Sequence, residues 1–371
     1  MINKITAIKY VDLSADKDNQ YLVDKEEGQY LGHPDSVLLE DGTIYTFYPK
    51  GHGKGPIVMK KSTDGGKTWS HRLPTPESWE TNQETPTIYL IEKSDGTKRL
   101  QLISGLPRDP GGFKTAYSED NGQTWTEFKH FFPGFKTIVA HASLIRLKNE
   151  DGSWQDKWMA VFHDSEYNNW KTYLTFDENG NEQWSQPVRL LEEHDEIEKH
   201  AGLCEIELVR SPDGKEIALL ARAQHKVTNA MIAFSQDEGD TWTPPREMPD
   251  FLMGERHKAQ YCPVSGRLLI CFREIVRKKR SMIKDEWVAG DWCAWVGTYD
   301  DLKNNRPGQY YIRLMQEFHK GDCGYAGNVA LPDGTFVLTS YGYWDEKVEN
   351  PYIMTVRLNL SELDEAVEKI L

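Results

Sequence analysis

One short motif occurs three times in this chain, and its repetition restricts the possible folds more than any other feature. The copies begin at Ser62, Ser118 and Ser235 and share the pattern Ser-x-Asp-x-Gly-x-Thr-Trp. In such a turn the Asp side chain accepts backbone hydrogen bonds, Gly supplies a positive φ, and Trp packs beneath the hairpin. A degraded copy spans 175–184. The motif is structural, and it predicts a chain built from repeated β units.

A second repeat runs in register with the first. Each unit is a run of alternating apolar residues, a turn containing Asp-Gly or Ser-Gly, and a second such run, which is typical of a β-hairpin. The six units begin at His33, Thr85, Ala140, Cys204, His257 and Gly324. Their spacing of about 50–70 residues is expected for propeller blades. We therefore predict an all-β fold, a six-bladed β-propeller of four-stranded antiparallel blades.

No linker rich in Pro, Gly or Ser interrupts these units, so we expect a single domain spanning 1–371. The first strand, around Ile5–Val11, is expected to complete the last blade and close the ring. The only helical pattern is a short C-terminal helix over Leu360–Leu371, with Ser361 as its N-cap before Glu362.

The charge balance argues against some classes of partner. The chain has 44 Lys and Arg against 58 Asp and Glu, a net charge of −14. Such a protein is repelled by nucleic acid and anionic lipid unless it carries a strong basic patch. The one basic cluster, Arg277–Arg280, is interpreted as a solvated loop between strands. No apolar stretch is long enough to span a membrane. We expect neither nucleic acid nor membrane as a partner.

The five cysteines are odd in number, and none forms a Cys-x-x-Cys pair. This pattern disfavours a disulfide framework or a zinc ribbon and fits a reducing compartment. The N-terminal residues show no apolar signal segment, so the expected location is the cytoplasm. No spacing typical of metal ligands occurs, and we expect no metal and no cofactor.

With these repeats in place, the chain resembles the sialidase (neuraminidase) superfamily, whose propellers carry the same Asp-box (BNR) motif. The resemblance implies roles for individual residues. The unit that begins at Cys204 places Glu205 and Arg222 at active-centre positions of the family. The unit that begins at Gly324 offers Tyr325 as the nucleophile. Arg273 corresponds to another arginine of the triad that clamps the substrate carboxylate.

The first blade departs from the family pattern. Sialidases carry Arg-Ile-Pro where this chain has His33-Pro34-Asp35. They also carry an acidic general acid soon after the second strand, where this chain reads Lys-Gly-His-Gly-Lys-Gly-Pro over 50–56. The chain is thus identified as a divergent member that lacks the usual first-blade Arg and the acid Asp, with His33 and His52 nearby.

Propeller geometry brings the starts of the innermost strands, and the loops after their partners, to one face around the axis. This rule collects a ring rich in His and Arg, which in an acidic protein favours an anionic ligand. Arg108, His225 and His257 also fall on this ring. The candidate catalytic residues are Tyr325, Glu205, His52 and His33. The candidate substrate-binding residues are Arg222, Arg273, Arg256, Lys54, Glu84, His141 and His163.

Three functions fit these residues. The first is a sialidase-like exo-glycosidase acting next to a carboxylate-bearing sugar, with Tyr325 as nucleophile, Glu205 as its base and His52 or a neighbour as the acid. The second is a lyase that performs β-elimination at a uronic acid, for example at a rhamnose–glucuronate link, with His33, His52 or Tyr325 moving the proton. The third is a non-catalytic sugar-binding propeller. The expected partner is an oligosaccharide with an acidic sugar.

Overall fold

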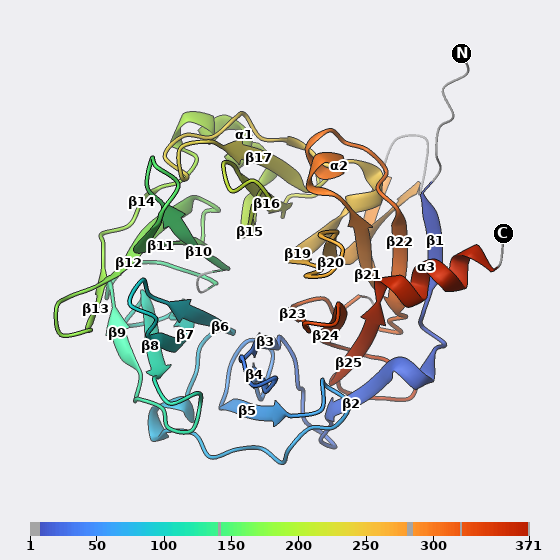
Figure 1. The fold of residues 1–371 in the computed structure, drawn as a ribbon, viewed down its shortest axis with the longest axis horizontal. Helices are drawn as coiled ribbons and strands as arrows, with labels where there is room; N and C mark the ends of the chain where they lie inside the picture. The colour runs from blue at the N-terminus through green and yellow to red at the C-terminus, as the bar shows by residue number, and fades with distance from the viewer. Residues whose placement is uncertain (1–7, 140–141, 280–284, 320, 370–371) are drawn as a thin grey trace.

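Six β-sheets are arranged around a central axis as the blades of a propeller (Figure 1). The computed structural model describes residues 8–139, 142–279, 285–319 and 321–369. In each blade the first strand lies nearest the axis and the following strands pair antiparallel towards the rim, with one parallel strand, Lys9–Asp12, added at the outer edge of blade 5 (Figure 1). The predicted six-bladed, all-β fold is confirmed.

The first three blades follow one another along the chain. Blade 1 contains β3 (Asp35–Leu38), β4 (Ile44–Pro49) and β5 (Ile57–Ser62). Blade 2 contains β6 (Pro86–Glu92), β7 (Lys98–Gly105), β8 (Phe113–Ser118) and β9 (Lys129–Phe131). Blade 3 contains β10 (Ser143–Lys148), β11 (Trp154–His163), β12 (Asn169–Phe176), β13 (Glu182–Trp184) and β14 (Val188–Arg189).

The last three blades complete the ring. Blade 4 contains β15 (Leu203–Arg210), β16 (Ile217–Ala223), β17 (Met231–Ser235) and β18 (Arg246–Glu247). Blade 5 contains β19 (Gly254–Tyr261), β20 (Leu268–Lys279), β21 (Asp285–Gly297), β22 (Tyr310–Met315) and β1 (Lys9–Asp12). Blade 6 contains β23 (Ala326–Ala330), β24 (Thr335–Gly342), β25 (Tyr352–Asn359) and β2 (Gln20–Asp24).

The two repeats of the sequence have distinct structural roles. The Asp-Gly and Ser-Gly turns join the two innermost strands of each blade, as Gly42 does with a φ of 84° between β3 and β4. The Asp boxes follow the third strand. In the first of them, Asp64 Oδ1 accepts hydrogen bonds from the backbone N–H groups of Lys67 at 3.1 Å and Thr68 at 2.9 Å. Each box therefore fixes a turn at the rim of the ring.

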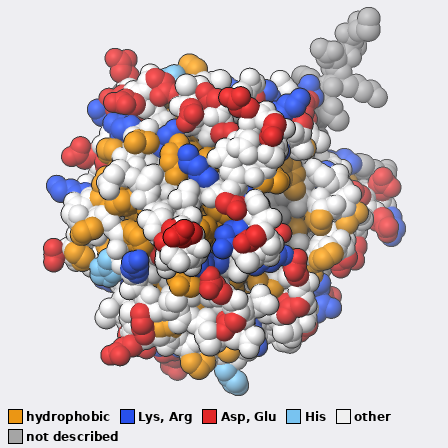
Figure 2. All heavy atoms as spheres, turned by 60° about the vertical axis from the view of Figure 1, so that its left-hand side comes forward, with side chains coloured by type: hydrophobic (Ala, Val, Ile, Leu, Met, Phe, Trp, Pro, Cys, Tyr) orange, Lys and Arg blue, Asp and Glu red, His pale blue; other side chains and the backbone are white. Residues whose placement is uncertain are grey.

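The central strands carry the core because each is covered by neighbouring blades on both faces. All seven residues of β16 are buried, and its sequence is a continuous apolar run broken only by Arg222. Such a run is typical of a strand without a solvent face. The outer surface is polar, with acidic side chains spread over the view in Figure 2 and basic ones between them. No helix in the described part of the chain is long and apolar enough to cross a membrane.

The ring closes through a different strand from the one predicted. β2 (Gln20–Asp24) pairs antiparallel with β25 and completes blade 6. The earlier segment, Lys9–Asp12, pairs in parallel with β22 of blade 5 instead. The prediction that Ile5–Val11 closes the last blade was therefore wrong, and residues 1–7 lie outside the described residues. Either short segment can satisfy an open strand edge, and their order along the chain does not decide which one does.

Three helices are present in the described residues: α1 (Asp195–Ala201), α2 (Tyr299–Lys303) and α3 (Leu360–Glu368). The first two were not predicted. The N-cap of α3 is Asn359, whose side chain accepts from the Ser361 N–H at 2.9 Å, so Ser361 is not the cap. Four short 3-10 turns complete the elements: η1 (Lys17–Asn19), η2 (Glu77–Trp79), η3 (Glu192–His194) and η4 (Asp250–Leu252).

The basic cluster was also misplaced. Residues 277–279 continue strand β20 and pair with residues 285–287 of β21, so they are not a loop. Arg280 lies outside the described residues.

Strand β2 offers a matched test of ring closure. Val23 is 2% exposed and packs against blades 1 and 6, whereas the adjacent Leu22 is 53% exposed. We expect Val23→Ala to lower the free energy of unfolding by about 2 kcal/mol, from the lost methyl groups and the cavity they leave. Leu22→Ala should change it by less than about 0.5 kcal/mol. Urea unfolding measures both, and equal effects would show that β2 does not close the ring.

Candidate active site

Five of the six blades present one described side chain at an equivalent place, at the start of the innermost strand. These side chains are His33, Glu84, Glu205, Arg256 and Tyr325. Each lies two residues before an innermost-strand residue, respectively Asp35, Pro86, Glu207, Lys258 and Gly327. The sixth blade position, His141 in blade 3, lies outside the described residues. The structure therefore brings these five candidates to one end of the ring.

Three of these residues have a left-handed backbone. The φ angles are 58° at His33, 48° at Glu205 and 62° at Arg256. Glu205 and Arg256 sit where the register of β15 and β19 shifts against the next strand. Such bulges redirect a side chain, and a left-handed non-glycine residue costs about 1–3 kcal/mol. The fold tolerates this strain where it turns side chains towards a shared centre.

Glu205 and Tyr325 form the centre of the site. The Tyr325 hydroxyl donates a hydrogen bond of 2.7 Å to Glu205 Oε1. The same oxygen accepts a hydrogen bond of 2.8 Å from Arg222, and Arg256 lies 3.7 Å from the second oxygen. The Arg256 guanidinium also lies 4.1 Å from the centre of the Tyr325 ring. A phenol, a carboxylate and two cations thus meet at one point.

The charges of this centre follow from its surroundings. Burial opposes the ionisation of Glu205, but Arg222 and Arg256, together with the Tyr325 hydrogen bond, lower its pKa far below the usual range. Burial and the neighbouring Glu205 charge both raise the pKa of Tyr325 well above its ordinary value. Near neutral pH the pair is therefore an ionised carboxylate and a neutral phenol.

A second carboxylate, Glu255, holds the arginines in place. It is 2% exposed, binds Arg273 directly and lies 3.3 Å from Arg222 Nε. Lys226 approaches it to 3.7 Å. Burial opposes its ionisation, but Arg273 and Arg222 lower its pKa. Sequence reasoning missed Glu255, although it immediately precedes Arg256 and shares the same bulge.

The first-blade histidines lie beside the Tyr325 ring. The His33 ring is 4.8 Å from that of Tyr325 and 4.8 Å from that of His52. Burial, with Arg256 adding to it, lowers the pKa of His33 well below its ordinary value, so this imidazole is neutral. Its Nδ1 is buried without a hydrogen-bond partner. His33 and His52 thus occupy the region that the sequence predicted for them.

Three further side chains, which no sequence pattern marks, connect these histidines. Tyr30 hydroxyl lies 2.8 Å from His52 Nδ1 and donates to Asp322 at 2.9 Å. Tyr341 hydroxyl donates to Asp322 at 3.1 Å and accepts a 2.8 Å hydrogen bond from Arg256. All three lie outside the starts of the innermost strands. No repeat marks these positions, although Asp322 lies three residues before Tyr325.

Glu84 is the remaining acidic group at this face. Its Oε1 accepts hydrogen bonds of 2.9 Å from both the backbone N–H and the hydroxyl of Thr85. It lies against the loop that carries His52, because a Cβ on Gly53 would meet Glu84 Oε1 at 2.9 Å. Burial, with a contribution from Glu205, raises the pKa of Glu84 to about 7. Near neutral pH this carboxyl group can therefore give up a proton.

The other candidates are divided between the site and the scaffold. His163 is buried near Glu205 and Arg222, whose charges act on it, and its Nε2 has no hydrogen-bond partner. Lys54 is exposed near His52 and adds to the charges acting on it. His257 belongs to the scaffold, because its ring stacks on Phe272 and its Nε2 lies 3.1 Å from a backbone carbonyl. Its assignment to the ring was wrong. Arg108 and His225 are exposed.

A small cavity of about 50 Å³ lies between Glu205, Arg256 and Tyr325 and the residues that follow them on the innermost strands. Lys258 lies 4.0 Å from Asp35 and 3.9 Å from Glu207 there. Burial opposes the Lys258 charge, but the two carboxylates outweigh it and raise its pKa. This trio ties blades 1, 4 and 5 together.

In the described residues, no group of three or more His, Cys, Asp or Glu side chains could hold a metal ion, and the five cysteines are buried and unpaired.

Comparisons with known proteins agree with this architecture. A family model described as a BNR repeat-like domain matches residues 91–259, and one for the BNR/Asp-box repeat matches 60–71. A sialidase of Clostridium perfringens is 29% identical in a match that covers 32% of this chain and 37% of that protein. The match thus spans little more than a third of that relative.

Solved structures share the fold over most of the chain. A protein of unknown function from Dyadobacter fermentans has a TM-score of 0.64 at 18% identity and covers 92% of this chain and 98% of its own. An α-L-arabinofuranosidase of Fusarium graminearum, with arabinobiose, has 0.60 at 13% identity, covering 93% and 98%. An intramolecular trans-sialidase of Ruminococcus gnavus has 0.57 at 15% identity, covering 90% and 95%. At these identities the likeness is one of fold.

A substitution of Glu255 tests whether its carboxylate stabilises the buried arginines Arg222 and Arg273. We expect Glu255→Gln to lower the free energy of unfolding at pH 7 by about 3 kcal/mol, because it leaves two buried guanidinium groups without their shared carboxylate. Glu40→Gln removes the exposed partner of Lys98 and should cost less than about 1 kcal/mol. Since the Glu255 pKa is lowered in the folded state, the stability difference should shrink as the pH falls through the acid range. Chemical denaturation at several pH values measures this, and a pH-independent difference would contradict it.

Proposed function

Because the chain belongs to the sialidase superfamily of BNR-repeat propellers, we propose that it is a glycoside hydrolase whose nucleophile is Tyr325. The observation that carries this proposal is the 2.7 Å hydrogen bond from the Tyr325 hydroxyl to Glu205. A phenol held against an ionised carboxylate is the arrangement that nucleophilic catalysis by tyrosine requires.

In the first step, Tyr325 Oη attacks the anomeric carbon while its proton passes to Glu205. The glycosidic C–O bond breaks, and the leaving oxygen takes a proton from Glu84. The product of this step is a covalent glycosyl–tyrosine intermediate, an aryl glycoside in which the anomeric carbon is bonded to Tyr325 Oη. Water then attacks the same carbon with Glu84 as base, and Tyr325 departs with the proton returned from Glu205. Two displacements give retention of configuration.

The acid in this scheme is Glu84 rather than His52. Glu84 has a pKa of about 7, which matches a group that donates and accepts a proton near neutral pH. The pKa of His52 is lowered by partial burial and, despite Asp322, by Arg256, so its protonated form is scarce at that pH. Glu84 thus replaces the acid that the first blade lacks.

The charges favour a sugar that carries a carboxylate. The guanidinium groups of Arg222, Arg256 and Arg273 face two ionised carboxylates, Glu205 and Glu255. Three positive and two negative charges leave one positive charge uncompensated in this set, and a neutral phenol nucleophile does not repel an anionic substrate. We propose exo-action at a terminal acidic sugar.

A lyase is the second candidate, and the contact between His33 and Tyr325 favours it. A neutral imidazole with an unpartnered Nδ1 could accept the C5 proton of a uronic acid, and Tyr325 could protonate the leaving oxygen.

Incubation with sialyl, rhamnosyl-glucuronate and other uronate oligosaccharides separates the hydrolase from the lyase. A new reducing end without ultraviolet absorbance supports the hydrolase, whereas absorbance of an unsaturated uronate supports the lyase. Binding without turnover across the panel would overturn both in favour of a sugar-binding propeller.

Tyr325→Phe tests the nucleophile. On a substrate found in that panel, we expect kcat to fall by more than about 10³-fold, because the phenol that forms the covalent linkage in this mechanism is lost. The near-ultraviolet circular dichroism should be unchanged. Tyr21→Phe in β2, which removes a hydroxyl that donates to the backbone carbonyl of Asp18, is the matched control and should retain full activity. Full activity in Tyr325→Phe would exclude the mechanism.

Glu84→Gln tests the acid. In the unmodified protein, activity should decline above about pH 7 as Glu84 loses its proton. Glu84→Gln should lower kcat by about 10²–10⁴-fold and abolish this decline. A dinitrophenyl glycoside, whose leaving group needs no proton, should recover most of the loss. Glu92→Gln, at the exposed far end of β6, is the control. An unaltered pH profile in Glu84→Gln would assign the acid to another group.

A further inference from the structure

A larger cavity lies at the other end of the innermost strands. It has a volume of about 490 Å³ and is formed by the end of β10, the start of β11, and the turns that follow β15 and β19. Glu205 and Arg210 both lie on β15, five residues apart, which at about 3.3 Å per residue separates the two sites by roughly 16 Å of strand. This cavity is therefore distinct from the site at Tyr325.

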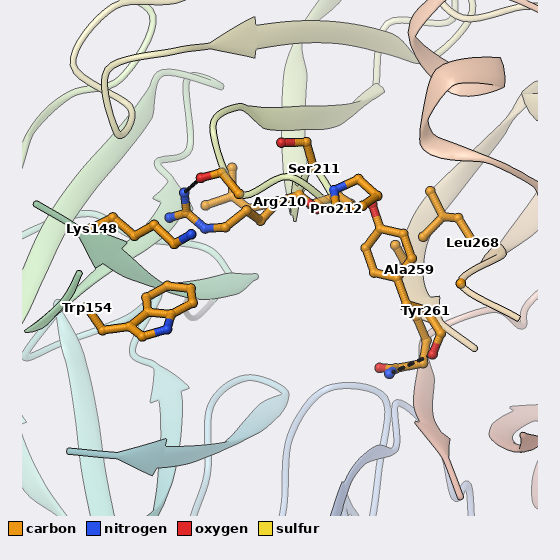
Figure 3. Close-up of a pocket in the computed structure, with 13 residues that line it drawn as sticks. Lys148, Trp154, Arg210, Ser211, Pro212, Ala259, Tyr261 and Leu268 are labelled. Carbon is orange, nitrogen blue, oxygen red and sulfur yellow. Dashed lines mark hydrogen bonds between the residues drawn. The ribbon is translucent and has the colours of Figure 1, made fainter. Parts of the chain in front are cut away.

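An exposed tryptophan forms one wall of this cavity. Trp154 is 46% exposed at the first position of β11. The Lys148 ammonium lies 4.7 Å from the centre of its ring, and the Arg210 guanidinium lies 5.5 Å from it. Figure 3 shows Trp154 and Lys148 on one side of the cavity and Tyr261 and Leu268 on the other. A large aromatic surface held beside a hollow is a typical platform for a ligand ring.

The lining is positively charged in an otherwise acidic protein. The chain has 58 Asp and Glu, yet none is among the thirteen residues that line this cavity. Arg210 is held by two hydrogen bonds of 2.7 Å to Glu238 and one of 2.8 Å to a backbone carbonyl. The Lys148 ammonium makes no ion pair or hydrogen bond to the described parts of the chain. One cation is thus fixed and compensated, and the other is available.

We propose that this cavity is a second carbohydrate-binding site, which takes a carboxylate-bearing sugar with its ring on Trp154 and its carboxylate at Lys148. The volume lies within the range of about 300–1,000 Å³ found for small-molecule sites. Gln260 adds a neutral polar side chain to the two cations, and Leu208, Val209 and Leu268 add apolar surface, which suits the mixed surface of a pyranose. The absence of acidic residues from the lining selects an anionic ring over a neutral one. The inference does not depend on the reaction at Tyr325.

Affinity electrophoresis tests the proposal. The protein is run as Tyr325→Phe, so that the polymer is not cleaved, in native gels that contain polygalacturonate, hyaluronan or fully methyl-esterified pectin. We expect retardation by at least one of the two polyanions and little by the neutral ester. Because the protein itself carries a charge of −14, non-specific attraction to a polyanion is disfavoured. Trp154→Ala and Lys148→Gln should each weaken the apparent affinity at least fivefold.

Two controls match these variants in place and type. Val188→Ala removes an apolar group of equal exposure in the same blade, and Lys157→Gln removes a charge from the same strand as Trp154. Both should migrate as the parent does. Any of three results would overturn the proposal. Trp154→Ala could leave the retardation unchanged, the neutral ester could retard the protein equally, or neither polyanion could retard it. When Tyr325 is left intact, the Trp154→Ala variant should cleave small aryl glycosides at the rate of the unmodified protein. A failure of the second-site proposal is thus distinguished from a failure of the proposed hydrolase activity.

Discussion

The buried carboxylate of Glu205 is stabilised by groups from three blades of the ring. An ionised carboxylate in a buried place is costly unless cations and hydrogen-bond donors surround it. Here they come from three blades: Arg222 from blade 4, Arg256 from blade 5 and the Tyr325 hydroxyl from blade 6. Blade 6 is completed only when β2, from the start of the chain, pairs with β25. The site therefore forms only in the closed propeller, and the stability of the closure and the geometry of the site are linked.

The backbone at this centre is strained in a regular way. His33, Glu205 and Arg256 occupy equivalent places in three blades, and all three are left-handed without being glycine. At Glu205 and Arg256, a strand with regular pleating would direct the side chain along the blade surface, whereas the bulge turns it towards the axis. Two positions further on, Asp35, Glu207 and Lys258 form the ion trio that joins the same three blades. The ion trio of Asp35, Glu207 and Lys258 supports the strained residues His33, Glu205 and Arg256, because it fixes the innermost strands on which, or directly before which, those residues lie.

The sequence predicts the parts of this arrangement that repeat. The in-register units bring Glu205, Arg256 and Tyr325 to one end of the ring, because equivalent positions in a propeller meet at the axis. The family resemblance was needed to single out Glu205, Arg222 and Tyr325 among the residues collected there. Glu255, Tyr30 and Asp322 could not be found in this way, since they come from a bulge and from connections whose paths no repeat encodes. The same reason explains the error in ring closure: Lys9–Asp12 and Gln20–Asp24 are both short strands, and only the three-dimensional positions of the open edges of blades 5 and 6 decide their partners. His257 was misassigned because the bulge at Arg256 turns the following side chain into the core.

In the proposed mechanism, Tyr325, activated by Glu205, forms a covalent bond to the sugar. Fluorinated glycosyl fluorides, which form such an intermediate readily but release it slowly, test this most directly. The protein would be incubated with the fluoride of a sialic acid and of a uronic acid, digested, and analysed by mass spectrometry. We expect one added sugar on the peptide that contains Tyr325, and none when Glu205 is replaced by Ala. A sugar attached to Glu205, Glu84 or any other residue would contradict it.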